Sequence, residues 1–119
     1  MPRTALTVQT LKGPHPGTVA ANALDFTWAA ADDVNLNDFP HTGREVILVR
    51  NDNVAAQTIT LTSKLSSLNR LGTVTDYSVG IGEYAGIWAG DIAGWKQADG
   101  KFYLEASAND VFFAILRLP

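Results

Sequence analysis

Apolar and polar residues alternate with a period of two along much of the chain, whereas the 3.6-residue period of an amphipathic helix is hard to find. Near the start, Leu6 and Val8 share one face and Thr7 and Gln9 share the other, and segment 57–62 repeats this pattern. Such alternation is typical of strands that bury one face against a core. The sequence therefore predicts an all-β protein.

The alternating segments are short and recur at intervals of about ten residues, a spacing typical of β-sandwiches and barrels. We expect roughly eight or nine short strands in a single domain over residues 1–119, arranged as an antiparallel β-sandwich of jelly-roll type. Residues 1–5 are expected to form an N-terminal arm. The expected strands cover residues 4–11, 24–29, 44–50, 57–62, 73–79, 83–88, 93–97, 101–106 and 111–118.

Two of these segments are apolar on both faces. Residues 46–49 and 111–116 are continuous apolar runs, which indicates central strands covered from both sides. A third segment alternates: Leu24, Phe26 and Trp28 point one way and polar residues the other. This pattern predicts an aromatic stripe that faces the core.

Turn-forming residues separate the expected strands. Asp99-Gly100 is the strongest hairpin signal, because glycine adopts positive φ without steric cost. Residues 30–43 are polar, rich in Asp and Asn, and hold Pro40 near their end. They predict a long loop.

Composition narrows the classes of protein. Hydrophobic residues make up 46% and charged residues 18%, which argues against disorder. The net charge is −3 with no basic run, so we expect no nucleic-acid partner. The lack of cysteine excludes disulfides, thiolate zinc sites and cysteine nucleophiles. No apolar run approaches the roughly 18 to 20 residues of a membrane span and no signal peptide is evident, so we expect no membrane partner and synthesis in the cytoplasm.

Few residues are suited to catalysis. His15 and His41 both lie beside proline in expected loops, where a solvated histidine is the usual outcome. Glu45, Glu83 and Glu105 lie on or beside expected strands, where alternation turns them outward. We therefore expect no enzyme and no cofactor.

An acidic loop resembles the start of a calcium site. Oxygen-bearing side chains occupy alternate positions at Asp33, Asn35 and Asn37. An EF-hand would also need Gly at the sixth position and Glu at the twelfth, where this chain has Asp38 and Arg44. We therefore favour a structural loop without a metal.

Glycines and aromatic residues gather in the window 79–95. One interpretation is a stacking platform for sugars or a patch for a protein partner, because Trp and Tyr offer large contact areas. The other places Tyr84 and Trp88 on one face of a core strand, with the glycines in bulges and turns. The sequence favours the second interpretation but leaves the first open.

The order of several segments along nearly the whole chain is also informative: residues 17–23 (GTVAANA), 35–39, 42–51 (TGREVILVRN), Gly82-Glu83-Tyr84, Gly94-Trp95 followed by Asp99-Gly100, and the closing residues 116–119. In this order the chain resembles the small virion or head-associated proteins of tailed bacteriophages and prophages. The resemblance implies a capsid decoration, or cement, role and brings no catalytic residues with it.

From the residues and this resemblance we expect a non-enzymatic phage structural protein, made in the host cytoplasm, that binds the major capsid protein on the head surface as a homo-oligomer. The candidate contact residues are Arg3, Pro14, His15, Pro16, Tyr84, Trp88 and Trp95. The alternative is a carbohydrate- or host-surface-binding module of the particle, motivated by Tyr84, Trp88 and Trp95. An enzyme would need a pocket that gathers Asp33, Asp38 and His41.

Overall fold

A computed structural model describes residues 2–13, 21, 22, 24–64 and 71–119. The described residues form strands and turns with no helix, so the all-β prediction is confirmed. Accordingly, no described helix is long and apolar enough to cross a membrane. The strands are β1 (Thr4–Ala5), β2 (Val8–Thr10), β3 (Ala29–Ala30), β4 (Asn37–Pro40), β5 (Glu45–Asn51), β6 (Gln57–Thr62), β7 (Val74–Val79), β8 (Tyr84–Ala89), β9 (Lys101–Ala106) and β10 (Val111–Arg117).

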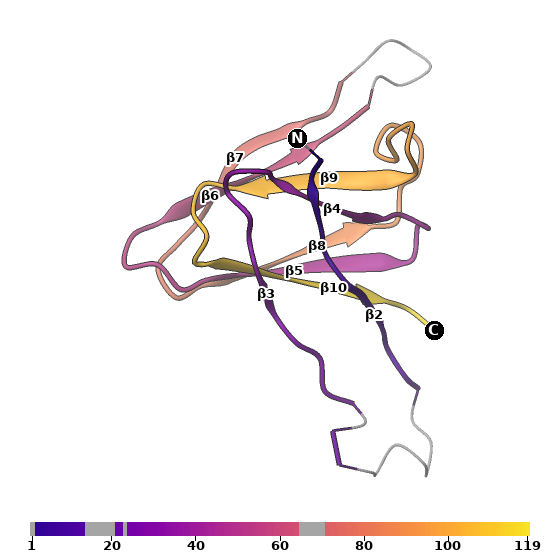
Figure 1. The fold of residues 1–119 in the computed structure, drawn as a ribbon, viewed down its shortest axis with the longest axis horizontal. Coiled ribbons are helices and arrows are strands. Elements are labelled where there is room, and N and C mark those ends of the chain that lie inside the picture. Colours follow the sequence, from indigo (N-terminus) through magenta and orange to yellow (C-terminus); the bar gives the residue numbers. More distant parts are fainter. Residues whose placement is uncertain (1, 14–20, 23, 65–70) are drawn as a thin grey trace.

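The strands form two sheets that lie one above the other (Figure 1). Sheet A has the order β1-β4-β9-β6-β7, and sheet B has the order β2-β10-β5-β8 with β3 also paired to β10. Most neighbours are antiparallel, but β1 runs parallel to β4 and β2 runs parallel to β10. The expectation of a fully antiparallel fold was therefore wrong at the N-terminal segment.

The N-terminal segment departs from the expectation because it belongs to both sheets. Thr4 and Ala5 pair with β4 in sheet A, and the chain then crosses to pair as β2 in sheet B. Residues 4–5 are therefore part of a sheet rather than of an arm. Leu6 lies at the crossing, only 5% exposed, and its N–H donates to the Asp38 carbonyl at 2.8 Å.

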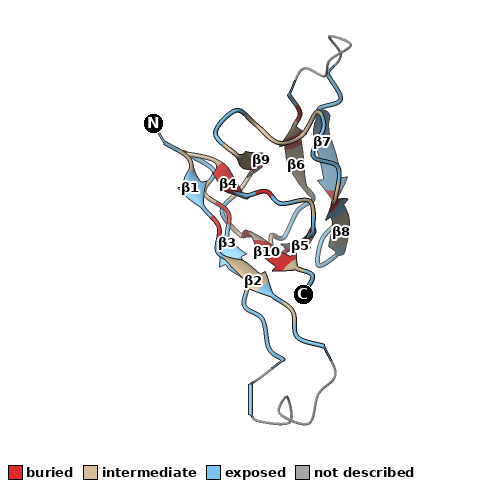
Figure 2. Cartoon of the chain, turned by 90° about the vertical axis from the view of Figure 1, so that its right-hand side faces the viewer, coloured by how far each residue is buried: buried red, intermediate tan, exposed pale blue. Residues whose placement is uncertain are grey.

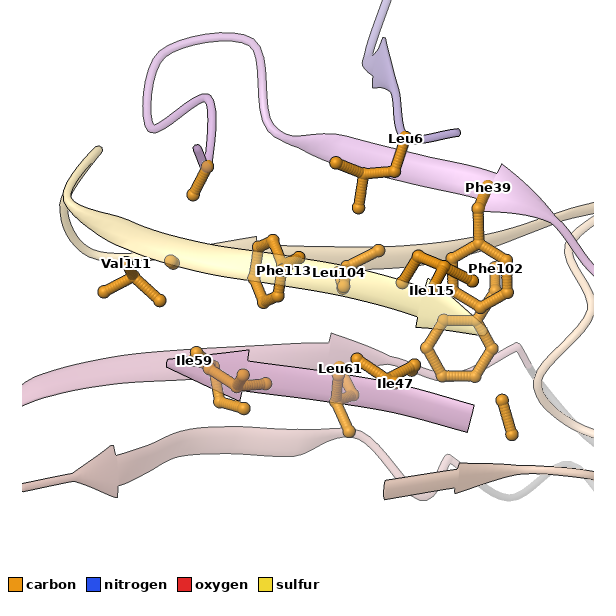
Figure 3. Packing of buried hydrophobic residues seen from close by; sticks show 14 of the residues in the cluster. Leu6, Phe39, Ile47, Ile59, Leu61, Phe102, Leu104, Val111, Phe113 and Ile115 are labelled. Carbon is orange, nitrogen blue, oxygen red and sulfur yellow. The ribbon is translucent and has the colours of Figure 1, made fainter. Parts of the chain in front are cut away.

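The core lies between the sheets (Figure 3). Along β10, Val111, Phe113 and Ile115 are buried, and along β5 Ile47 and Val49 are buried. β10 pairs with β5 along its whole length and with β2 and β3 on its other edge. The prediction that segments 46–49 and 111–116 form central strands is confirmed for their place in the sheet. Cover from both sides is not found for β5, because Val46 and Leu48 on its outer face are only half-buried.

One expected strand is replaced by a turn. Over residues 93–97 the chain bends instead of extending, because the N–H groups of Trp95 and Lys96 both donate to the Ile92 carbonyl. The turn expected at Asp99-Gly100 is present, with φ of 82° at Gly100 and an N–H from Gly100 to the Gln97 carbonyl at 2.9 Å. The hairpin signal was therefore correct for the turn but not for the preceding strand.

The aromatic stripe expected to face the core was also wrong. Leu24 is 58% exposed and Phe26 is 37% exposed, and only the end of the expected segment enters a strand, as β3. The side chain of Gln9 binds both backbone groups of Thr27, at 2.8 and 2.9 Å. A side chain thus holds this segment where backbone pairing was expected.

Conversely, the expected loop over residues 30–43 contains a strand. β4 lies inside sheet A, between β1 and β9. Its polar residues Asn37 and Asp38 are buried, and Pro40 is its last residue, where a missing N–H is tolerated. Polar composition therefore concealed an internal strand.

Candidate interaction surface

β8 is positioned by a buried asparagine at the end of β5. The side-chain N–H groups of Asn51 donate to the carbonyls of Ala55, Val79 and Gly80, at 3.0, 2.9 and 3.2 Å. Its backbone also bonds to the turn between β7 and β8, in which Gly82 has φ of 67°. Asn51 therefore fixes the turn that carries the chain from sheet A to sheet B.

Alternation along β8 puts Tyr84 and Trp88 on the outer face of sheet B. Tyr84 is 68% exposed and Trp88 is 71% exposed, while Ala85 and Ile87 pack against the core from the other face. The two aromatic residues share a face, but that face points to solvent and not to the core. The core-strand interpretation was wrong for this pair, because alternation assigns residues to faces without saying which face is buried.

A row of aromatic side chains crosses the outer face of sheet B. Phe112, Arg50 and Tyr84 are in register on three adjacent strands. Trp28 lies over this row: its ring is 5.0 Å from the Arg50 guanidinium and 6.0 Å from the Tyr84 ring. The guanidinium also lies 4.6 Å from the Phe112 ring. We call Trp28, Arg50, Tyr84 and Phe112 the aromatic row.

Electrostatics and stacking hold the aromatic row in place. The Arg50 guanidinium is attracted by the ring faces on both sides and is also paired with Asp52 at 3.0 Å. Trp28 and Tyr84 meet edge to face, a geometry that aromatic pairs prefer. The row is therefore ordered before any partner binds.

The indole of Trp88 lies beside Gly90. A Cβ atom at Gly90 would lie 1.9 Å from indole carbons of Trp88, so the ring occupies the space that any side chain there would need. The absence of a side chain at Gly90 thus lets the indole lie close to the backbone, while most of its surface stays exposed.

A groove runs between the edge strands of the two sheets, β7 and β8. Its two parts have volumes of about 460 and 140 Å³ and share the lining residues Leu61, Val74 and Ile87. Figure 2 shows β7 and β8 together on one side of the molecule, with β1 and β2 on the opposite side. The groove therefore marks an open side of the fold.

Trp95 belongs to this groove and not to the outer face. It is half-buried, lines the smaller part of the groove and stacks on Phe102 at 5.7 Å. It therefore packs against the core, whereas Trp88, which also lines the smaller part of the groove, is largely exposed.

The other expected contact residues lie elsewhere. Arg3 donates to the carbonyls of Asn37 and Leu104 at 3.0 and 3.3 Å and lies 4.2 Å from the Tyr103 ring. These contacts hold Arg3 against sheet A, whereas β8 is an edge strand of sheet B. Pro14, His15 and Pro16 lie outside the described residues.

Glu45 was expected to face outward but is fully buried. Its carboxylate accepts the N–H groups of Thr42 and Gly43, at 2.7 and 3.2 Å, the Thr42 hydroxyl and the Arg117 guanidinium. Burial alone would raise the pKa of Glu45, but the hydrogen bonds from Thr42 and Arg117 outweigh it and lower the pKa to about 2. The outward assignment was wrong because β5 places this residue on its inner face, where loop and C-terminal strand meet.

The acidic loop is organised by its own hydrogen bonds. The Asp32 carboxylate accepts the N–H groups of Val34 and Asn35, at 3.0 and 2.9 Å, and the Thr4 hydroxyl. The hydroxyl of Thr4 contributes most to lowering the pKa of Asp32, to about 2. Asn37 in turn accepts the Asp32 N–H at 2.9 Å. Among the described residues, no group of three His, Asp or Glu side chains is placed to hold a metal ion.

The three residues that an enzyme would need do not come together in the groove. Asp33 is exposed, whereas Asp38 and His41 are buried, and none of the three lines the groove. His41 donates from Nε2 to the Ala89 carbonyl at 2.7 Å and meets the stacked rings of Phe39 and Phe102 edge to face. It therefore acts in packing, at the end of β8.

The aromatic row is the feature that the sequence did not reveal as a unit. Trp28 and Arg50 were not expected to contribute, because they come from segments far apart in the chain. Only the pairing of β10, β5 and β8 brings them together. Comparison with known proteins adds no further assignment: no protein-family model matches the sequence, and neither a curated protein nor a solved structure is significantly similar to the chain.

Proposed function

We propose that this protein is a non-enzymatic structural component of a tailed-phage particle that decorates the head by binding the assembled shell of the major capsid protein, as a homo-oligomer. The observation that carries the proposal is the aromatic row on the outer face of sheet B, in which Arg50 lies against the rings of Trp28 and Phe112.

The chemistry of the aromatic row suits a protein partner. Trp, Tyr and Arg dominate the residues that contribute most to protein–protein binding, because they combine a large contact area with directed hydrogen bonds. The contacts of Arg50 with Trp28 and Phe112 hold these side chains in place beforehand. Binding then costs little side-chain entropy.

The phage assignment draws on the order of segments described for the sequence, and the strand order supports it. We propose that β3 to β10 form a jelly roll, a fold common in viral capsid proteins and lectins. The supporting observation is the neighbour order β3-β10-β5-β8 in one sheet and β4-β9-β6-β7 in the other, all antiparallel. β1 and β2 are then additions that run along the edge of this jelly roll.

The test is co-sedimentation of the purified protein with undecorated capsid shells, together with mass spectrometry of virions. We expect binding that saturates at a fixed ratio to capsid subunits. Arg50→Ala should weaken binding by about tenfold or more, since it removes the centre of the aromatic row. Arg44→Ala, at an exposed arginine outside the row, is the matched control.

Two results would count against this proposal. One is failure of the wild-type protein to co-sediment while it is also missing from virions. The other is equal binding by Arg50→Ala and Arg44→Ala, which would remove the aromatic row as the contact.

A carbohydrate- or host-surface-binding module is the second candidate, and the exposed indole of Trp88 favours it. A flat, exposed ring beside Gly90 is the kind of surface on which a sugar ring stacks. Titration with glycans should then change tryptophan fluorescence in the wild-type protein and not in Trp88→Ala. An unchanged emission across a panel of glycans would remove this candidate.

A further inference from the structure

The two edge strands on the open side differ in how they resist pairing with another chain. β7 is interrupted by a register shift opposite Ile59 and Leu61, and Asp76 in it has φ of 53°. A bulge and a charge are two of the devices that keep edge strands from associating. β7 is therefore a protected edge.

β8 has none of these protections. Its six residues carry no charge and no proline, and its register with β5 is continuous from Tyr84 to Ala89. Among the described residues no strand pairs with its outer edge. An extended, uncharged and regular edge of this kind is a template for a further strand.

We propose that β8 pairs antiparallel with β8 of a second copy of this chain, about a two-fold axis through Gly86. The pairing joins two copies of sheet B into one continuous sheet. It deepens the proposed function, since it rests on the homo-oligomer part of that function and names the contact between copies.

The spacing of side chains along β8 selects this register. Tyr84 and Trp88 lie two residues to either side of Gly86 on the same face, so Tyr84 of each copy falls opposite Trp88 of the other. Directly opposed aromatic residues are among the most stabilising cross-strand pairs. Two-fold symmetry forms this pair twice.

Flanking charges favour the same register. With the axis at Gly86, Glu83 lies opposite Ala89 of the second copy and Asp91 lies opposite Ile81 of the second copy, so no carboxylates meet. Moving the axis to Ile87 would set Glu83 against Asp91. Moving it to Ala85 would place Tyr84 opposite Gly86 and lose both aromatic pairs.

The contact area predicts a weak dimer. Tyr84 and Trp88 are about two-thirds exposed, so the four rings of two copies offer about 400–700 Å². With the backbone of the paired strands, the buried area reaches the low end of specific interfaces, near about 1,000 Å². We therefore expect a dissociation constant in the micromolar range.

The test is sedimentation velocity of the purified chain without capsid shells, from about 1 µM to about 1 mM. The wild-type protein should pass from monomer to dimer over this range. In Y84K/W88K the proposed register puts lysine opposite lysine, so dimerisation should weaken by about tenfold or more. V34K, at a largely exposed valine in the loop between β3 and β4, should dimerise like the wild type.

A charge-reversal variant tests the register itself. In Y84E/W88K each glutamate would lie opposite a lysine of the second copy, so dimerisation should recover relative to Y84K/W88K and weaken again as salt is added. Thermal melts check that all variants stay folded, which the exposure of both side chains leads us to expect.

Each remaining result overturns the inference. A wild-type protein that stays monomeric throughout excludes self-pairing, and a dimer that persists in Y84K/W88K places the contact elsewhere. Equal loss in Y84K/W88K and Y84E/W88K excludes the Gly86 register. Because the shells are absent, none of these results bears on capsid binding, which co-sedimentation measures separately.

Discussion

The two long sides of this molecule are closed in different ways. On one side the chain crosses from sheet A to sheet B between β1 and β2 and buries Leu6 at the crossing. On the other side the chain crosses between β7 and β8 through a tight turn, and a groove remains along both strands. The N-terminal segment pairs with both sheets and therefore covers the core along its side. The β7–β8 turn joins the two sheets at one end only and leaves the groove beside it open.

The largest expected effect is at the closed side. Leu6→Ala should lower the free energy of unfolding by about 3 kcal/mol, because it removes a buried side chain and leaves a cavity between the sheets. The same change at the exposed Leu118 should cost under about 0.5 kcal/mol. Urea titration of both variants measures the difference, and similar losses would mean that Leu6 does not seal this side.

A smaller effect is expected at Glu45, which ties the two central strands of sheet B to the loop before β5. Glu45→Gln should cost about 2 kcal/mol at neutral pH, because a charged acceptor for Thr42 and Arg117 is lost. The pKa of Glu45 falls from its ordinary 4.5 to about 2 on folding, so its contribution is complete above pH 4.5 and disappears as the pH falls toward 2.

Unfolding by urea at a series of pH values checks this assignment. The free energies of the wild type and Glu45→Gln should converge as the pH falls through about 2, because the native Glu45 carboxylate then becomes protonated. A gap that stays constant from pH 7 down to pH 2 would contradict the charge-based explanation.

The smallest effects compare the two tryptophans of the open side. Trp95 is half-buried on Phe102, so Trp95→Ala should cost about 1.5 kcal/mol. Trp88 is largely exposed, so Trp88→Ala should cost under about 0.5 kcal/mol. Thermal melts of the two variants measure these losses of stability. A larger loss of stability for Trp88→Ala than for Trp95→Ala would indicate that Trp88 packs in the core.

Much of the fold follows from local pattern. The strands near residues 57–62, 101–106 and 111–118 match their expected bounds within a residue, because their inner faces are aliphatic or aromatic and their ends carry turn residues. β4 escaped prediction because Asn37 and Asp38 are polar yet buried. The Asn37 side chain donates to the Thr4 carbonyl, and the backbone carbonyl of Asp38 accepts the Leu6 N–H. Nothing local to β4 signals those partners.

The candidate surface was predictable only in part. Alternation placed Tyr84 and Trp88 together, but the choice of face depends on what packs on the other side, and Ala85 and Ile87 take the core position. The contribution of Arg50 depends on the register of three strands, which a single sequence does not specify. The aromatic row thus depends on the pairing of β10, β5 and β8, which composition does not reveal.

The place of β2, which follows the crossing at Leu6, also determines when the fold can be completed. β2 pairs with residues 115–117 of β10, far away in the sequence. On the ribosome, Val8 to Thr10 therefore stay without this partner until β10 has been synthesised. Closing so long a loop is entropically costly and slow, so docking of this segment is expected to be the last step of folding.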